Sequence, residues 1–390
     1  MTGLARIQGE MKILLAPDSF KESLSARAAA VTMERAVKRA IPGAETVVLP
    51  IADGGEGTME TLVFATGGEV HRAEVTGPLG TPVTARYGTL GDRVTGVVEM
   101  AEASGLHLVP AGRRDPRVTT TRGTGELIRH AVDRGATRLV VAIGGSATND
   151  AGAGALQALG VGLFDERGAP IGPGADGLAR LARIDFSTLD PRLRAADLRV
   201  ACDVTNPLCG PRGASAVFGP QKGATPEMVA VLDATLRRFA ETLRRDAGLD
   251  VLEAPGAGAA GGLGAALLAC GGRLVPGIEL VLDAVGFDQK APGAAAVLTG
   301  EGRIDAQTPG GKVIAGLVGR AAAAGVPVIA FAGCVEPGFE PLYSRGLLSV
   351  HAILPRPASL AEALAAGEAN LEAAVFAVAR LLSRWPVPRA

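Results

Sequence analysis

Short apolar runs alternate with stretches of helical hydrophobic spacing at both ends of the chain. The apolar runs are 12–16, 46–52, 294–298, 326–332 and 350–354. Between them, and again over 360–382, apolar residues recur three or four positions apart, which is the spacing of an amphipathic helix. This alternation predicts a parallel sheet whose strands are connected by helices.

The pattern changes in the middle of the chain. Between residues 70 and 100, short β segments are broken by glycine and proline. A buried strand at 139–143, another strand at 198–202 and a long helix at about 226–247 follow. The middle of the chain is therefore expected to form a different kind of α/β layer from the two ends.

These patterns predict an α/β protein of two domains. The 390 residues exceed what one hydrophobic core usually supports. We expect one domain from residues 11–75 together with 280–385, and a second domain, 76–279, inserted into it. Residues 1–10 lack the apolar core of a signal peptide and are expected to form a flexible leader.

Composition and charge narrow the class of partner. The net charge of −1 gives no overall attraction to nucleic acid or to an anionic membrane, and no apolar run reaches the ~18 residues of a spanning helix. The four cysteines form neither a CxxC pair nor a zinc-ligand spacing, which favours reduced thiols. We expect a cytoplasmic protein with small-molecule partners, no nucleic acid and no membrane, and the pattern leaves monomer and homodimer open.

A glycine-rich loop follows the strand at 139–143. Its residues Gly144, Gly145, Ser146, Thr148 and Asn149 lead into a helix that carries Gly152 and Gly154, with Asn149 or Asp150 as the expected N-cap. Strand, glycine loop and helix N-terminus together are a common anion-binding arrangement, because the backbone can approach a phosphate closely there. The alternative is a tight connection in which glycine only relieves crowding.

A second glycine run, 258–264, contains Gly261 and Gly262 and opens another helix. It is the second expected phosphate-binding loop. The overlapping GxGxxG of 256–261 follows Pro255 rather than a clean strand, so it is a weak dinucleotide fingerprint. No GxxxxGK[ST] loop and no GxSxG elbow occurs, and the four histidines are scattered.

Acidic residues repeatedly follow the apolar runs, and ligands of open α/β sheets bind beyond strand ends of this kind. They are Asp18, Asp53, Asp150, Asp203, Glu301 and Asp305, with Glu56 close behind Asp53. Any one of them alone is more typical of a turn or a cap. Together, beside glycine loops, they favour a metal–phosphate site, since Mg²⁺ takes one or two carboxylates and phosphate oxygens. Lys21, Lys222 and Lys312 lie in the same set of loops and predict a positive lining for a phosphate or carboxylate.

Six segments carry a resemblance to a known family. They are PDSFKESLSA (17–26), ADGGEGT (52–58), GGSATNDAGAG (144–154), DVTNPLCGPRGASAVFGPQKGAT (203–225), GAAGGLG (258–264) and TGEGRIDAQTPGGK (299–312). In order and spacing they resemble the signature blocks of the type-1 bacterial glycerate kinases over residues 11–382. Ala151 stands where the family commonly has glycine, and Pro309-Gly310 replace bulkier residues, which affects only local loop conformation.

The resemblance implies a Rossmann-like parallel-sheet domain split in sequence and an inserted second α/β domain with a mixed sheet. It also implies an active site in the cleft between them. The implied reaction is ATP-dependent phosphorylation of D-glycerate, with 2-phosphoglycerate favoured over 3-phosphoglycerate, in organic-acid, glyoxylate or sugar-acid catabolism. ATP and Mg²⁺ are the implied cofactors.

Chemistry and position then assign roles to individual side chains. Asp203 and Glu301 are candidate metal ligands and, with Asp305, candidate proton acceptors. The cationic candidates for glycerate or the transferring phosphoryl group are Lys21, Arg303, Lys312 and Lys222. Asp53 and Glu56 are candidates for the glycerate hydroxyls or the metal.

Two other classes of function share a two-domain α/β architecture. An NAD-dependent hydroxy-acid oxidoreductase requires a dinucleotide fingerprint, which is weak in this chain. A sugar-acid binding protein does not explain the many acidic loop residues.

Overall fold

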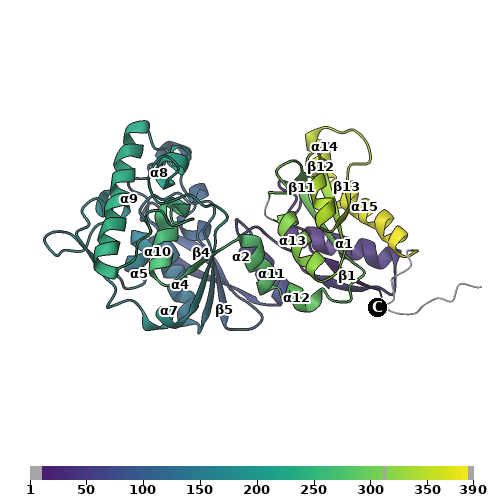
Figure 1. The fold of residues 1–390 in the computed structure, drawn as a ribbon, viewed down its shortest axis with the longest axis horizontal. Helices are drawn as coiled ribbons and strands as arrows, with labels where there is room; N and C mark the ends of the chain where they lie inside the picture. Colours follow the sequence, from purple (N-terminus) through teal and green to yellow (C-terminus); the bar gives the residue numbers. More distant parts are fainter. Residues whose placement is uncertain (1–10, 311–312, 385–390) are drawn as a thin grey trace, which may run out of the picture. The chain divides into compact units, whose positions relative to one another are not determined.

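The chain forms two compact units, described by a computed structural model for residues 11–310 and 313–384. The split unit contains the chain up to Ala52 and from Val281 onwards, and the middle unit is Asp53–Leu280. Figure 1 shows each unit as helices packed on a sheet. The expected leader, 1–10, and Lys312 lie outside the described residues.

The first crossing between the units lies earlier than the sequence boundary at 75/76. Strand β3 (Glu69–Thr76) pairs antiparallel with β4 (Pro82–Thr89) along its whole length, and helix α2 (Thr58–Thr66) contacts β3, β4 and β5. Residues 53–75 therefore belong with the middle unit, because their pairing partners are there. The second crossing, at Leu280/Val281, lies where the parallel pattern was expected to resume.

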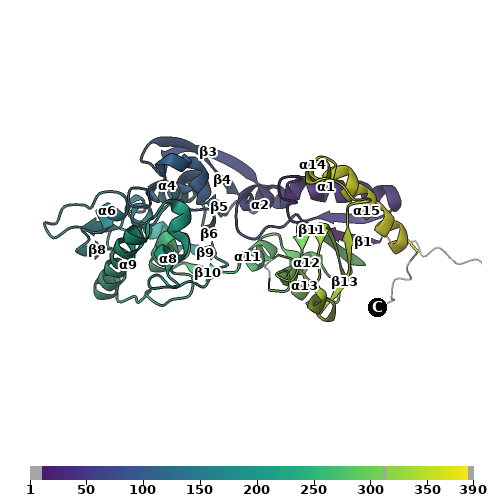
Figure 2. The ribbon, with the colours of Figure 1, turned by 90° about the horizontal axis from the view of Figure 1, so that it is seen from above.

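The split unit is a parallel sheet of five strands in the order β13-β12-β11-β1-β2. Its strands are β1 (Lys12–Leu15), β2 (Glu45–Val48), β11 (Ala296–Ile304), β12 (Val328–Val335) and β13 (Leu347–Ala352). Its helices are α1 (Ala26–Ala40), α12 (Phe287–Lys290), α13 (Val313–Ala323), α14 (Leu360–Ala365) and α15 (Gly367–Leu382). Figure 2 shows α1 and α15 on one side of this sheet and α12 and α13 on the other.

This strand order places a topological switch point between β1 and β11. The connection from β1 leads to β2 on one side, whereas the connection from β11 leads to β12 on the other. Ligands of doubly wound sheets bind at the carboxyl ends of the strands beside such a switch point. The predicted parallel-sheet domain assembled from both ends of the chain is confirmed.

Helix α1 shows why the terminal segments associate. The Ser25 side chain accepts a hydrogen bond from the Ala28 amide (3.2 Å) and so caps the start of the helix. Its apolar stripe, which includes Met33 and Val37, packs with Leu371 and Val375 of α15 in one buried cluster. Segments from opposite ends of the chain thus share a core.

The middle unit is built on a mixed sheet of six strands in the order β10-β9-β6-β5-β4-β3. Strands β3, β4 and β5 are antiparallel neighbours, whereas β5, β6, β9 and β10 run parallel. The remaining strands are β5 (Thr95–Glu99), β6 (Arg138–Ala142), β9 (Asp197–Ala201), β10 (Arg273–Val275) and the antiparallel pair β7 (Gly162–Phe164) and β8 (Arg183–Asp185). The predicted inserted α/β domain with a mixed sheet is therefore present.

Helices cover both faces of this sheet. They are α3 (Ala101–Ser104), α4 (Arg122–Asp133), α5 (Ala153–Ala158), α6 (Gly174–Leu178), α7 (Pro191–Ala195), α8 (Ala214–Phe218), α9 (Pro226–Ala247) and α10 (Leu263–Ala269), while α11 (Gly277–Ala284) contains the second crossing. Gly88 of β4 faces Met59 and Val63 of α2, and its neighbour Tyr87 stacks against His130 of α4. Within residues 11–310 and 313–384, no helix combines the length and hydropathy that crossing a membrane demands.

Candidate functional site

The carboxyl ends of four parallel strands meet at one edge of the middle unit's sheet, and the loop 52–57 lies across them. A Cβ added at Gly54 would lie 2.7 Å from the Cβ of Ala201, which ends β9. A Cβ added at Gly144, which follows β6, would lie 3.3 Å from the Cα of Gly55. Because only glycine allows these approaches, the two predicted loops 52–58 and 144–150 come together at this edge.

Asp53 and Asp203 lie at this edge beside the same residue, Gly277. The Gly277 amide donates to Asp203 Oδ1 (2.9 Å) at the start of α11, and a Cβ on Gly277 would lie 1.8 Å from the carbonyl oxygen of Asp53. Asp53 Oδ1 also accepts from the Gly55 amide (2.8 Å). Glu56, in the same loop, is exposed. The structure thus gathers three predicted acidic residues at one sheet edge.

The loop after β6 presents exposed backbone. Gly144 and Gly145 are exposed, and Gly145 has φ +75°, a conformation that favours glycine. Leu106 donates to the carbonyl of Gly145 (2.8 Å), and Ala147 donates to that of Ser104 (2.9 Å). Among the described residues, the amides of Gly144, Gly145 and Ser146 donate to no protein acceptor. This backbone can therefore bind an anion.

The helix that follows this loop does not offer its N-terminus to a ligand. The buried carboxylate of Asp150 accepts from the amides of Gly152 (3.1 Å) and Gly154 (3.3 Å), and from the amide and hydroxyl of Thr121 (both 2.9 Å). Burial raises the pKa of Asp150. The N-cap residue of α5 is Gly152 rather than the expected Asn149 or Asp150, but the Asp150 carboxylate binds the first amides of the helix and occupies the end that the anion-binding arrangement would have used.

The second glycine run packs against the first loop instead of facing outward. Gly261 (φ +66°) and Gly262 (φ +92°) are both buried. A Cβ at Gly261 would lie 2.0 Å from the carbonyl oxygen of Thr148, and one at Gly262 would lie 2.7 Å from the Cα of Ala151. These glycines bring two backbone segments into contact, and the expectation that the run is a second phosphate loop stays a prediction.

Thr148 and Asn149 are buried as well. The Asn149 amide donates to the Ser215 hydroxyl (3.1 Å). The Thr148 hydroxyl has no hydrogen-bond partner among the described residues. Both side chains lie inside the unit, and Ser146 is buried as well, so the exposed part of the predicted nucleotide loop is limited to Gly144 and Gly145.

Lys222 reaches this loop from inside the unit. Its side chain is buried, and Nζ donates to the Ser146 hydroxyl and to the Thr148 carbonyl (both 2.6 Å). Burial lowers the pKa of Lys222 to about 7, against an opposing effect of the Asp150 charge. The structure thus places the ammonium on the loop itself, and the predicted direct contact of Lys222 with substrate stays a prediction.

Glu99, at the end of β5, is a residue of this edge that sequence analysis missed. It is 4% exposed and accepts from the amides of Met59 (2.6 Å) and Gly57 (3.3 Å) at the start of α2. Burial raises the pKa of Glu99 to about 7. Its position in the sequence could have revealed it. Glu99 is a single acidic residue at the end of an apolar run, as Asp203 and Glu301 are.

The split unit holds the other predicted residues at its own carboxyl edge. Strand β11 continues through Ile304, so the expected loop 299–305 is mostly strand, paired with β12 up to Val335. Asp18 donates its amide to the carbonyl of Gly300 (2.8 Å), and a Cβ on Gly302 would lie 3.4 Å from the amide nitrogen of Lys21. The exposed Lys21 therefore lies next to β11 at the switch point.

Three predicted residues of the split unit, Glu301, Arg303 and Asp305, line one cavity of about 200 Å³. Arg303 pairs with Glu336 (2.6 Å) and with Asp305 (3.3 Å), and these carboxylates raise the pKa of the guanidinium, Glu336 most. Asp305 Oδ1 accepts from the Gln307 amide (2.8 Å). The cavity combines both charge signs, which suits a small hydroxy acid.

The donor set at the middle unit's edge fits Mg²⁺. The ion takes one or two carboxylates and completes its octahedron with water and phosphate oxygens, and Asp203 and Asp53 bring two carboxylate residues to either side of Gly277. Across the described part of the chain, no group of three or more His, Cys, Asp or Glu side chains is arranged to hold a metal. Glu301 belongs to the split unit, so a metal shared by Asp203 and Glu301 stays a prediction.

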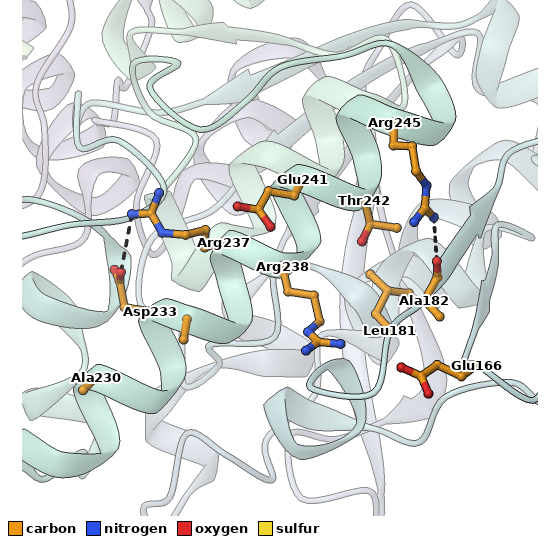
Figure 3. A pocket seen from close by; sticks show the side chains of 11 residues that line it. Glu166, Leu181, Ala182, Ala230, Asp233, Arg237, Arg238, Glu241, Thr242 and Arg245 are labelled. Carbon is orange, nitrogen blue, oxygen red and sulfur yellow. Dashed lines mark hydrogen bonds and ion pairs between the residues drawn. The ribbon is translucent and has the colours of Figure 1, made fainter.

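A larger depression, of about 650 Å³, lies along α9 and contains none of the predicted residues. Figure 3 shows Arg237, Arg238 and Glu241 along the helix, with Glu166 opposite. Arg245 donates to the carbonyl of Ala182 (2.5 Å). Because acidic and basic side chains alternate along this exposed helix, the lining of the depression indicates no particular class of ligand.

Known proteins match this chain over nearly its whole length. A family model described as the glycerate kinase family matches residues 13–383. A glycerate kinase of Bacillus subtilis is 53% identical over 354 residues, covering 90% of this chain and 93% of that protein. A glycerate 2-kinase of Escherichia coli is 49% identical over 362 residues, covering 93% and 95%. A crystal structure of a putative glycerate kinase 2 from Salmonella typhimurium superposes with a TM-score of 0.87 at 50% identity, over 96% of this chain and 98% of that one.

Proposed function

Because the chain belongs to the glycerate kinase family, it is a phosphotransferase with an alcohol acceptor, and we propose that it phosphorylates the 2-hydroxyl of D-glycerate with ATP. The named activity of the 49% identical glycerate 2-kinase supports 2-phosphoglycerate as the product. The observation that carries the proposal is the exposed backbone of Gly144 and Gly145, which follows β6 beside the loop of Asp53 at the edge where Asp203 also lies.

The middle unit supplies the phosphate and metal groups in this proposal. The amides of Gly144, Gly145 and Ser146 bind phosphate oxygens, and Asp203, with Asp53 and Glu56 beside it, holds Mg²⁺ or orients glycerate. Mg²⁺ neutralises charge on the phosphates and fixes their orientation when bound. The protein's own part is to hold the phosphate chain on rigid backbone, which favours an in-line approach of the acceptor hydroxyl.

The split unit supplies the remaining groups. Lys21, Arg303 and Lys312 bind the glycerate carboxylate or the transferring phosphoryl group, and Glu301 or Asp305 accepts the hydroxyl proton. The cavity that Glu301, Arg303 and Asp305 share supports this division. The proposal requires groups of both units to act on the same substrates, as the expectation of an interdomain active site implies.

The deciding experiment measures turnover and identifies the product. With D-glycerate and MgATP, we expect ADP release that stops when glycerate or Mg²⁺ is omitted. Phosphorus NMR with authentic standards should show the 2-phosphate ester. A product with the resonance of 3-phosphoglycerate would contradict the regiochemistry. A folded protein that releases no ADP but oxidises hydroxy acids with NAD would contradict the whole assignment.

We further propose a cytoplasmic enzyme of organic-acid, glyoxylate or sugar-acid catabolism that acts on small molecules. Light scattering with and without MgATP decides between monomer and homodimer.

A further inference from the structure

We propose that Lys222 is a positioning residue, which fixes the shape of the loop 144–148 for phosphate binding without touching either substrate. The inference rests on the proposed function and deepens it. A phosphate site made of backbone amides requires a rigid loop, and in this proposal the buried Lys222 ammonium provides that rigidity.

The backbone of Lys222 is held in a fixed place. The residue ends a short 3-10 helix, Pro220–Lys222, and its amide donates to the carbonyl of Gly219 (2.9 Å). Gly223 follows with φ +97°, and a Cβ there would lie 2.3 Å from the carbonyl oxygen of Arg114. A side chain that starts from so constrained a segment can fix what it binds.

The ammonium binds two points on the loop. Nζ donates to Ser146 Oγ and to the Thr148 carbonyl oxygen, each at 2.6 Å. Between these points, the Thr119 hydroxyl donates to the carbonyl of Ala147 (2.9 Å), and the Ala147 amide donates to Ser104. The inward-facing side of the loop is thus held in place, while the amides of Gly144, Gly145 and Ser146 donate to no acceptor among the described residues.

Burial separates this role from direct binding. Lys222 is 2% exposed, whereas Gly144 and Gly145 on the other side of the loop are exposed. The lysine therefore acts on the nucleotide through Ser146 and the backbone.

The test compares Lys222→Met with Lys290→Met in the full-length protein. Lys290 is a matched control, since its partly buried ammonium donates to one carbonyl, that of Val285 (2.7 Å), in the split unit. For Lys222→Met we expect the KM for MgATP and the Kd for MgADP to rise roughly 10- to 100-fold. The KM for glycerate should stay within about twofold, and Lys290→Met should match the wild type in all three constants.

A double-mutant cycle with Ser146→Ala tests the route. Alone, Ser146→Ala should raise the KM for MgATP about 2- to 10-fold, the effect of one lost hydrogen bond. Combined with Lys222→Met it should cause no further rise, because the lysine acts through this hydroxyl and the hydrogen bond between them is already lost. If instead the rises in the KM for MgATP multiply in the double variant, Lys222 and Ser146 act independently and the proposed action through Ser146 is wrong.

Two further outcomes would overturn the proposal itself. One is a folded Lys222→Met with unchanged nucleotide constants, and the other is a rise confined to the KM for glycerate, which would mark Lys222 as a substrate ligand. If Lys222→Met does not fold, hydrogen exchange of Ser146→Ala decides: faster exchange confined to the loop amides supports the proposal, and unchanged exchange contradicts it. A wild type without kinase turnover would instead refute the proposed function, independently of these variants.

Discussion

At the scale of single residues, burial distinguishes the ionisable groups that fix loop structure from those that are candidates for catalysis. Asp150 and Lys222 are buried and bind protein groups only, so they shape loops. Asp203, Glu301 and Asp305 are partly exposed at the carboxyl ends of strands. The sequence shows both sets alike as polar residues in glycine-rich loops, because burial depends on what packs around each loop.

The three partly exposed carboxylates are the candidates for chemistry. Replacing each with its amide, in Asp203→Asn, Glu301→Gln and Asp305→Asn, keeps shape and removes charge. If they hold metal or accept the proton, turnover should fall about 10²- to 10⁴-fold while the melting temperature stays nearly unchanged. In the Asp203→Asn variant the side-chain carbonyl can still accept from the Gly277 amide, so helix α11 keeps its cap. Near-normal turnover in all three variants would remove them from the mechanism.

Glu99 predicts a pH dependence of folding stability. Its pKa is about 7 in the folded protein against an ordinary 4.5, so its contribution is fully present below pH 4.5 and is lost as the pH rises through 7. That shift corresponds to about 3 kcal/mol. The neighbouring charges of Glu102 and Arg86 oppose each other in this effect.

Urea unfolding between pH 4.5 and 8 measures the effect. The free energy of unfolding of the wild type should fall more steeply with rising pH than that of Glu99→Gln, which has no proton to lose. Parallel curves for the two proteins would show that Glu99 is ionised throughout.

At the scale of elements, the periodic segments were predictable and the glycine runs were not. Helix α9 occupies the predicted 226–247, because Leu232, Leu236 and Phe239 recur at helical spacing over a long stretch. The loop expected at 299–305 is strand β11, since its partner β12 extends beside it. The run 258–264 faces Thr148 and Ala151, and no local pattern distinguishes a glycine that approaches backbone from one that approaches phosphate.

This difference has a measurable consequence at Gly261. Gly261→Ala forces a Cβ to 2.0 Å from the Thr148 carbonyl at φ +66°, whereas Gly135→Ala meets similar backbone strain at φ +94° with nothing within 4 Å. Thermal unfolding should show a loss of roughly 1 kcal/mol for Gly135→Ala and clearly more for Gly261→Ala. Equal losses would mean that the two segments do not pack as described.

At the scale of the whole molecule, each unit carries its own core. The buried cluster around Leu139, Leu156 and Phe239 draws only on the middle unit, whereas the cluster around Ile13 and Leu371 needs both ends of the chain. Domain insertion was readable from the sequence because the parallel pattern stops and resumes. The earlier crossing at Ala52/Asp53 was not, because it depends on the pairing of β3 with β4.

The separate cores predict different fates for fragments. A fragment of residues 53–280 should unfold cooperatively in urea with native-like circular dichroism. A fragment of 281–390 should not, because β11 lacks β1 and α15 lacks α1. A gradual, non-cooperative urea unfolding of the 53–280 fragment would contradict this expectation.

The insertion also imposes an order in time during synthesis. Strand β1 leaves the ribosome long before β11, whose residue Ala296 pairs with Ile13. At ~5–20 residues per second, β1 and β2 wait roughly a quarter of a minute to a minute for that partner. The middle unit completes its own contacts during this interval, while the apolar segments 12–15 and 45–48 stay without their sheet. Strand β1 is thus among the last to complete its contacts, and a nascent chain released before Ala296 leaves exposed the edge of β1 that β11 would cover.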